Sequence, residues 1–171
     1  MSSMFEKTVY FNQNINSWDV SQVTNMSYMF HSADAFNQNL NSWNISSVDN
    51  MEGLFWGAYQ FNGNISDWDT SHVTNMSKML IDTTFNQNIG NWNTGMVETM
   101  ELMFWNADFN QNIGNWDVGV VTNMLGMFQN AEIFNQSLNN WNTGSVNTMQ
   151  EMFHGASSFD QDLSLLSLIH I

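Results

Sequence analysis

The chain has 171 residues, 16 acidic side chains, two lysines and no arginine, and its formal net charge is −14 at pH 7. A chain with two cations cannot neutralise a row of phosphates, so the composition argues against nucleic-acid binding and against docking on an anionic membrane surface. The absence of Cys excludes disulfides, thiolate metal sites and thiol nucleophiles. With 43% hydrophobic residues the chain is too apolar for a disordered acidic tail, and its length suits a single domain over residues 1–171.

Neither end of the chain carries a targeting or membrane signal. Residues 1–7 contain no basic leader and no apolar run, so no signal peptide is expected. The longest apolar stretch, residues 163–171, is far shorter than the roughly 20 residues that span a bilayer, so no membrane insertion is expected. A secreted parent protein stays open, because the chain can be a fragment.

A motif of 24 or 25 residues repeats along the chain. Its opening, Phe-Asn-Gln-Asn-Ile/Leu-x-x-Trp, occurs in six complete units and in a truncated seventh unit at residues 159–171, and residues 4–10 match the end of a unit. The complete units start at Phe11, Phe36, Phe61, Phe85, Phe109 and Phe134. Repeats of this length indicate a solenoid in which each unit packs on its neighbours.

Each unit changes its hydrophobic period once, as the first unit shows. Ile15, Trp18 and Val20 fit a short strand, and the apolar residues between positions 23 and 33 share one face of a helical wheel. One strand and one helix per unit predict an α/β fold of the leucine-rich-repeat type. The parallel strands, about 4.8 Å apart, would line the concave side, and the wider helices on the convex side would force a curve.

The recurring Trp and Met residues are predicted to form the core. The Trp column comprises Trp18, Trp43, Trp68, Trp92, Trp116 and Trp141. Clustered Met could instead bind a soft metal such as Cu(I), but the helix-like spacing favours an adaptable core filler. No cofactor is therefore expected.

Two Asn columns recur in the predicted turns. They comprise Asn12, Asn37, Asn62, Asn86, Asn110 and Asn135, and then Asn14, Asn39, Asn64, Asn88 and Asn112. Stacked amides can satisfy backbone groups between neighbouring coils. A ligand-binding role is the alternative, but identity in nearly every copy favours a scaffold.

The outward position after each Trp alternates strictly between acid and amide. We call this set the Asp/Asn ladder: Asp19, Asn44, Asp69, Asn93, Asp117 and Asn142. On neighbouring strands its members would lie about 5 Å apart, so alternation reduces repulsion and would let each amide donate to the flanking carboxylates. The functional alternative is an array that binds Ca²⁺ or a hydroxylated ligand. The small polar residues beside the ladder suit glycan, mineral or ice, with ice the weakest match.

The predicted helices also present apolar residues far from their core face. Trp56, Ile81 and Trp105 would form an exposed stripe over three units, which Leu102 and Leu125 would extend. Contiguous exposed apolar area usually marks an interaction surface, so a partner or self-association contact is expected here. Packing under flanking loops is the alternative.

Catalysis finds little support in the sequence. No unit gathers Ser, His and Asp irregularly, and His31 and His154 are five units apart, too far to share a metal. The chain is therefore expected not to be an enzyme.

The unit F-N-Q-N-I-x-x-W-D-V-S-x-V-T-N-M-S-x-M-F, read at residues 11–30, resembles the repeats of the BspA-like leucine-rich-repeat surface proteins of bacteria. Similar repeats occur in mycoplasma-type surface lipoproteins, and the resemblance covers residues 4–163. It implies a secreted or cell-surface protein, and adhesion to host or matrix proteins is reported for some members. It supplies no catalytic or binding residues.

Two functions of different kinds stay open. The first is an extracellular adhesion module that binds a protein or matrix partner. The second is a structural spacer whose ends stack head to tail, because terminal repeats expose core and strand edges. Six apolar residues of the tail are candidates to cover the last unit: Leu163, Leu165, Leu166, Leu168, Ile169 and Ile171.

Overall fold

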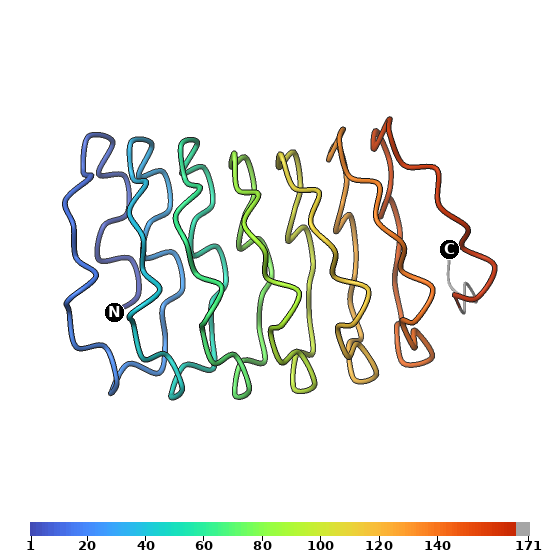
Figure 1. Ribbon diagram of the computed structural model, residues 1–171, viewed down its shortest axis with the longest axis horizontal. Coiled ribbons are helices and arrows are strands. Elements are labelled where there is room, and N and C mark those ends of the chain that lie inside the picture. The colour runs from blue at the N-terminus through green and yellow to red at the C-terminus, as the bar shows by residue number, and fades with distance from the viewer. Residues whose placement is uncertain (167–171) are drawn as a thin grey trace.

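The computed structural model describes residues 1–166, which form a row of coils stacked along the long axis (Figure 1). Each repeat unit makes one coil, and equivalent residues of successive coils pair in parallel as single β-bridges. The bridged residues are Asn25, Asn50, Asn75, Thr99, Asn123 and Thr148. Within residues 1–166 there is no helix, and no strand extends beyond these single bridges.

The predicted α/β leucine-rich-repeat solenoid, with one helix per unit, is therefore wrong. In the segment expected to be helical, the N–H of Met29 donates to the carbonyl of Met26 at 3.2 Å, three residues back rather than the four of an α-helix. The N–H of Met26 leaves its own coil and donates to the carbonyl of Asn50 at 2.9 Å. Every second N–H over residues 26–32 does the same, so the backbone is paired between coils. In the view of Figure 1 the row of coils is straight.

Consecutive β-turns explain why the sequence looked helical. In the first coil, five turns each join two apolar residues that are three positions apart. These pairs are Ile15 with Trp18, Val20 with Val23, Met26 with Met29, Phe30 with Ala33, and Ala33 with Phe36. The first and fourth residues of a β-turn approach one another, so both can enter the core while the two central residues face outward. An apolar period of three then resembles the period of a helix.

Two turns in each coil need a left-handed residue at their third position. In the first coil these residues are Tyr28 and Ser32, with φ of 56° and 55°. This geometry is that of a type II turn, in which Gly is favoured because a side chain costs about 1–2 kcal/mol. The equivalent positions of later coils are Gly53, Gly57, Lys78, Asp82, Leu102, Asn106, Gly126, Asn130, Glu151 and Gly155. Pairing on both sides of each coil therefore has to offset a recurring backbone strain.

The prediction that Trp and Met fill the core is confirmed, with one exception in the Trp column. Five of the six column Trp residues and every member of the two Met columns are buried. Trp18 is 37% exposed, since residues 1–10 pair with only the later half of its coil. Each buried Trp also donates its indole N–H to a carbonyl of the preceding coil, at 2.9–3.2 Å. The acceptors, in order from Trp43 to Trp141, are Ile15, Leu40, Ile65, Ile89 and Ile113.

The two Asn columns satisfy different groups. Asn86 Oδ1 accepts the N–H of Asn110 at 2.9 Å and the side-chain amide of Gln111 at 3.0 Å, both from the next coil. The first column therefore forms the predicted ladder between coils. In the second column, Asn88 Oδ1 accepts the N–H of Gly90 at 3.0 Å and so closes a turn of its own coil, as Asn14, Asn64 and Asn112 also do. Asn39 is the exception, because its Oδ1 accepts the N–H of Asn64 from the next coil at 2.9 Å.

The tail covers the sixth coil only in part within the described residues. Leu166 occupies the position at which a Trp is due and is buried, and Leu163 packs partly against the core. Leu165 is exposed, so it does not belong to the cover. Leu168, Ile169 and Ile171 lie outside the described residues.

Candidate binding surfaces

All six members of the Asp/Asn ladder are exposed, and each closes a turn of its own coil. Asp19 Oδ1 accepts the N–H of Ser21 at 3.0 Å, and Asn44 Oδ1 accepts that of Ser46 at 3.2 Å. Hydrogen bonds from the side chain and N–H of Ser21 lower the pKa of Asp19. Within residues 1–166 no hydrogen bond joins two ladder members, so the amides do not donate to flanking carboxylates as expected.

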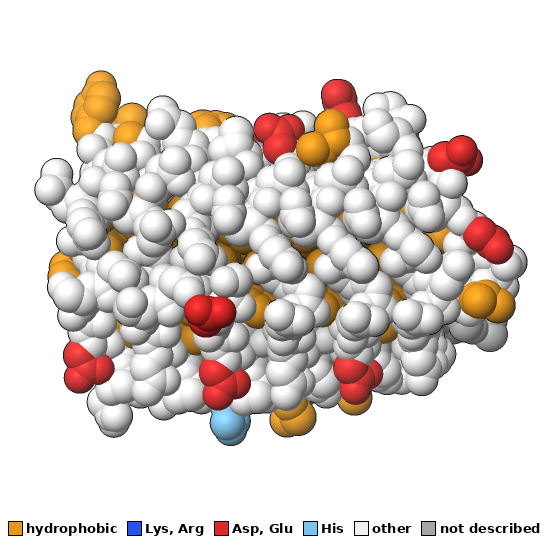
Figure 2. Space-filling view, viewed as in Figure 1, with side chains coloured by type: hydrophobic (Ala, Val, Ile, Leu, Met, Phe, Trp, Pro, Cys, Tyr) orange, Lys and Arg blue, Asp and Glu red, His pale blue; other side chains and the backbone are white. Residues whose placement is uncertain are grey.

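The acid alternation extends beyond the ladder. The first and third coils each carry a ladder Asp. The second and fourth coils carry a ladder Asn instead, and each has two carboxylates later in the coil. Those four carboxylates belong to Asp49, Glu52, Glu98 and Glu101, and the same positions of the first and third coils hold Thr24, Ser27, Thr74 and Ser77. Like charges of one column are thus two coils apart, about 10 Å, which halves their repulsion and approaches the screening length of physiological salt. Figure 2 shows acidic side chains mostly standing apart on one face.

The apolar stripe is less exposed than predicted. Ile81 is only 1% exposed, which contradicts its place on an open surface, and Trp56, Trp105 and Leu102 are half-buried. The helical wheel that placed these residues outward does not apply to a coil of turns. Trp105 Nε1 is buried and has no hydrogen-bond partner in the described part of the chain.

A polar chain beside this stripe links five successive coils. The Tyr28 hydroxyl donates to Glu52 Oε1 at 2.5 Å, and Lys78 Nζ lies 3.3 Å from Glu52 and 3.8 Å from Glu101. Asn123 Nδ2 extends the chain by donating to Glu101 Oε2 at 3.0 Å. Burial, followed by the hydrogen bond to Glu52, raises the pKa of Tyr28 to about 12. The only lysine of the six complete units is thus committed to structural ion pairs.

We expect Tyr28→Phe to lower the free energy of unfolding by about 1–2 kcal/mol at pH 8, because a hydrogen bond to a carboxylate is lost. The raised pKa means that the fold favours the protonated phenol. This contribution is complete below the unfolded value near 10 and is lost as the pH rises towards 12. The gap between wild type and variant should therefore narrow over that range in thermal unfolding followed by circular dichroism. Tyr59→Phe, at an exposed ring, is the control, and a gap that stays constant to pH 12 would contradict the assignment.

Asp69, Ser71 and His72 gather in one exposed turn, but not as a catalytic triad. Ser71 Oγ lies 3.3 Å from His72 Nδ1, and Asp69 accepts hydrogen bonds from Ser71. A triad needs the histidine between the hydroxyl and the carboxylate. Here the carboxylate and the histidine both contact the serine, so the hydroxyl has no base oriented by an acid.

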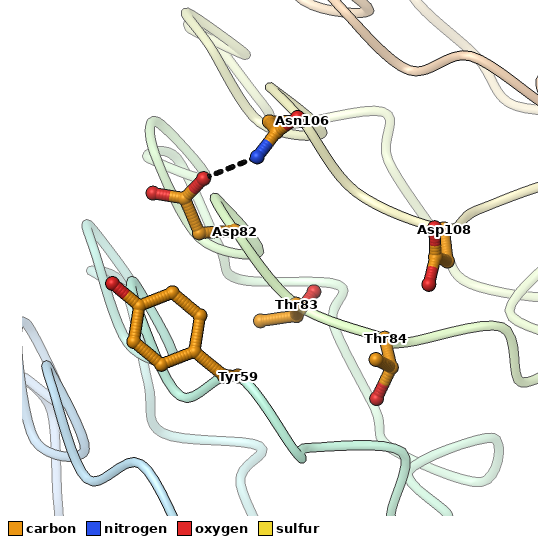
Figure 3. Close-up of a pocket in the computed structure, with 6 residues that line it drawn as sticks. All are labelled: Tyr59, Asp82, Thr83, Thr84, Asn106 and Asp108. Atoms are coloured by element: carbon orange, nitrogen blue, oxygen red, sulfur yellow. Dashed lines mark hydrogen bonds between the residues drawn. The ribbon is translucent and has the colours of Figure 1, made fainter.

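A pocket of about 300 Å³ opens between the second, third and fourth coils. Figure 3 shows its six lining residues: Tyr59, Asp82, Thr83, Thr84, Asn106 and Asp108. Asn106 Nδ2 donates to Asp82 Oδ1 at 2.7 Å, and the buried Thr83 hydroxyl donates to the carbonyl of Leu80 at 2.8 Å. The Tyr59 ring is 56% exposed. We call this site the edge pocket.

The edge pocket was not predicted from the sequence, although three signals point to it. The units that start at Phe61 and Phe85 are 24 residues long, one fewer than the others. Thr83 stands where the other complete units have Ala. Tyr59 is an aromatic residue in a column that holds acids in the first, fourth and fifth coils. The pocket therefore lies where the repeat is broken.

The described residues provide neither a membrane-spanning helix nor a cluster of metal ligands. Residues 1–166 contain no helix that is long and apolar enough to cross a membrane. Over the same residues, no three His, Asp or Glu side chains converge as ligands of one metal ion.

The fold and the repeat define a tandem-repeat protein built from stacked coils of β-turns. A family model described as "Mycoplasma protein of unknown function, DUF285" matches residues 1–84 and again residues 81–170. The chain therefore belongs to this Mycoplasma repeat family, and the leucine-rich-repeat assignment made from its sequence is not upheld. Searches of curated proteins and of solved structures found no match.

Proposed function

We propose that the chain is a non-catalytic binding module of a cell-surface or secreted protein, and that it adheres to a protein or matrix partner. The resemblance of its repeats to those of BspA-like and mycoplasma-type surface proteins supports this function. The observation that carries it is the edge pocket. An exposed aromatic ring and two carboxylates that have no ion pair within residues 1–166 meet there, whereas each member of the Asp/Asn ladder uses its Oδ1 to close a turn.

A non-catalytic role agrees with how the polar groups are used. The Asn columns and the ladder close turns or join coils, and Lys78 forms structural ion pairs. The proposed role needs no cofactor. A stack of identical coils instead supplies a rigid frame that holds one irregular site in place.

The test is surface plasmon resonance of the purified chain over immobilised collagen, fibronectin and laminin, with albumin as the reference surface. We expect saturable binding to at least one matrix protein at micromolar concentrations. Binding no stronger than that to albumin would reject adhesion to these partners. Light scattering over a concentration series distinguishes the binding module from the alternative, a self-assembling structural spacer. The mass of a self-assembling spacer would grow with concentration, and that of a binding module would not.

A further inference from the structure

We propose that the edge pocket binds a cationic side chain, the guanidinium of Arg or the ammonium of Lys, presented by a partner protein. This inference rests on the proposed function, because it names the chemistry by which the module would recognise its partner.

The pocket brings an aromatic ring and two carboxylates together from three successive coils. Tyr59, Asp82 and Asp108 lie around one opening in Figure 3, with Thr83 and Thr84 between them. The backbone fixes this arrangement, because the N–H of Asp82 donates to the carbonyl of Trp105 at 3.0 Å and that of Asp108 to the carbonyl of Thr83 at 3.0 Å. An exposed aromatic face attracts a cation, and carboxylates form charge-assisted hydrogen bonds with it.

No cation of the described residues occupies the pocket. Lys7 lies 3.5 Å from Glu6, and Lys78 lies between Glu52 and Glu101. Over residues 1–166 neither Asp82 nor Asp108 has an ion-pair partner. With a net charge of −14 on the whole chain, the surrounding field also favours a basic partner.

The pocket offers many acceptors and few free donors, which selects a ligand that only donates. Asn106 uses one of its two amide N–H donors on Asp82, and the Thr83 hydroxyl donates to a backbone carbonyl. The remaining donors are the second amide N–H of Asn106 and exposed hydroxyls such as that of Thr84, fewer than the acceptor sites of the two carboxylates and the other lining oxygens. A sugar hydroxyl both donates and accepts, whereas a guanidinium carries five donors and no acceptor. The lining therefore favours a cationic side chain over a glycan.

The experiment measures fluorescence anisotropy of a labelled peptide with three Arg residues separated by Gly, in 150 mM NaCl. We expect Asp82→Asn with Asp108→Asn to weaken binding at least tenfold and Tyr59→Ser to weaken it about threefold to tenfold. The matched control is Asp19→Asn with Asp69→Asn, which changes the net charge equally on the ladder and should weaken binding less than twofold. Both double variants keep the side-chain shape, and the amide oxygen at position 82 can still accept from Asn106.

Three results would overturn the proposal. Equal losses in the two double variants would mean that the peptide responds to net charge alone. A peptide with citrulline in place of Arg that binds as tightly would remove the need for a cation. Displacement of the Arg peptide by a neutral chitin oligosaccharide at lower concentration than by free acetyl-arginine amide would make the pocket a glycan site.

The proposal for the pocket and the proposed function can be rejected independently of one another. If the chain binds no matrix protein but the Arg peptide still depends on Asp82 and Asp108, adhesion to matrix is rejected and the pocket stands. If a matrix protein binds and the Arg peptide does not, only the pocket proposal is rejected.

Discussion

Trp116→Ala is expected to lower the free energy of unfolding by about 4 kcal/mol, among the largest effects of any single substitution in the stack. Trp116 is buried in the fifth coil, and its ring lies 6.3 Å from that of Trp92, nearly parallel to it. Truncation leaves a cavity between coils and removes the hydrogen bond from Nε1 to the Ile89 carbonyl at 3.0 Å. Because each coil contacts only its neighbours, damage in the middle weakens the coils on both sides.

The matched control is Trp18→Ala, at the same position of the first coil. Trp18 is 37% exposed, and within residues 1–166 its indole N–H has no hydrogen-bond partner, so a smaller loss of about 2 kcal/mol is expected. Urea unfolding followed by circular dichroism measures both variants. Trp116→Phe separates the contribution of ring packing from that of the hydrogen bond, because it keeps an aromatic ring and loses the hydrogen bond. Equal losses at positions 116 and 18 would show that burial between coils does not set the effect.

The core could be predicted from the sequence because its pattern does not depend on the kind of backbone. Met26 and Met29 point inward whether the residues between them form a helical turn or a β-turn, since both bring positions three apart together. For the same reason the pattern could not distinguish the two structures. Burial was therefore predicted correctly while the secondary structure was wrong.

One local signal did favour turns over helices. Asn25 stands at the start of the segment that was expected to be helical, and its Oδ1 accepts the N–H of Ser27 at 2.8 Å. Asn50 and Asn75 repeat this bond in the next two coils, to Glu52 and Ser77. An Asn side chain that captures an N–H two residues on offers the backbone an alternative to a helix. Repeated once per unit, this capture helps to hold the chain in turns.

The two candidate sites also differ in whether the sequence could predict them. The Asp/Asn ladder was visible in the sequence because it obeys the repeat, and its oxygens turn out to close turns. The edge pocket was not predicted, because the residue types in its columns change from coil to coil: Tyr59 is equivalent to Asp108, and Asp82 is equivalent to Asn106. Both shorter units contribute residues to the pocket. A motif built from recurring residue types does not reveal a site whose residue types differ from coil to coil.

Gly63→Gln would restore the residue that the other units carry, yet we expect it to lower the free energy of unfolding by about 2–3 kcal/mol. Substitutions towards a consensus usually stabilise, and replacing Gly also reduces the entropy of the unfolded chain by up to about 1 kcal/mol. In this fold Gly63 is buried, and a Cβ there would overlap the backbone carbonyl of Gln38 in the preceding coil. A backbone carbonyl cannot rotate away as a side chain can. The cost of this overlap should therefore exceed the stabilisation that comes from the lower entropy of the unfolded chain.

Gly144→Ser is the matched control for this prediction. It also restores a residue found in other units, but the nearest atom to its Cβ would be the Asn142 Oδ1 of its own turn, at 3.3 Å. Ser21 occupies the same position of the first coil and closes the same turn, so a change within about 0.5 kcal/mol is expected. Urea midpoints compare the two variants and Gly63→Ala, which adds the Cβ alone. If Gly63→Ala matched Gly144→Ser, contact between the second and third coils would not be what requires glycine at position 63.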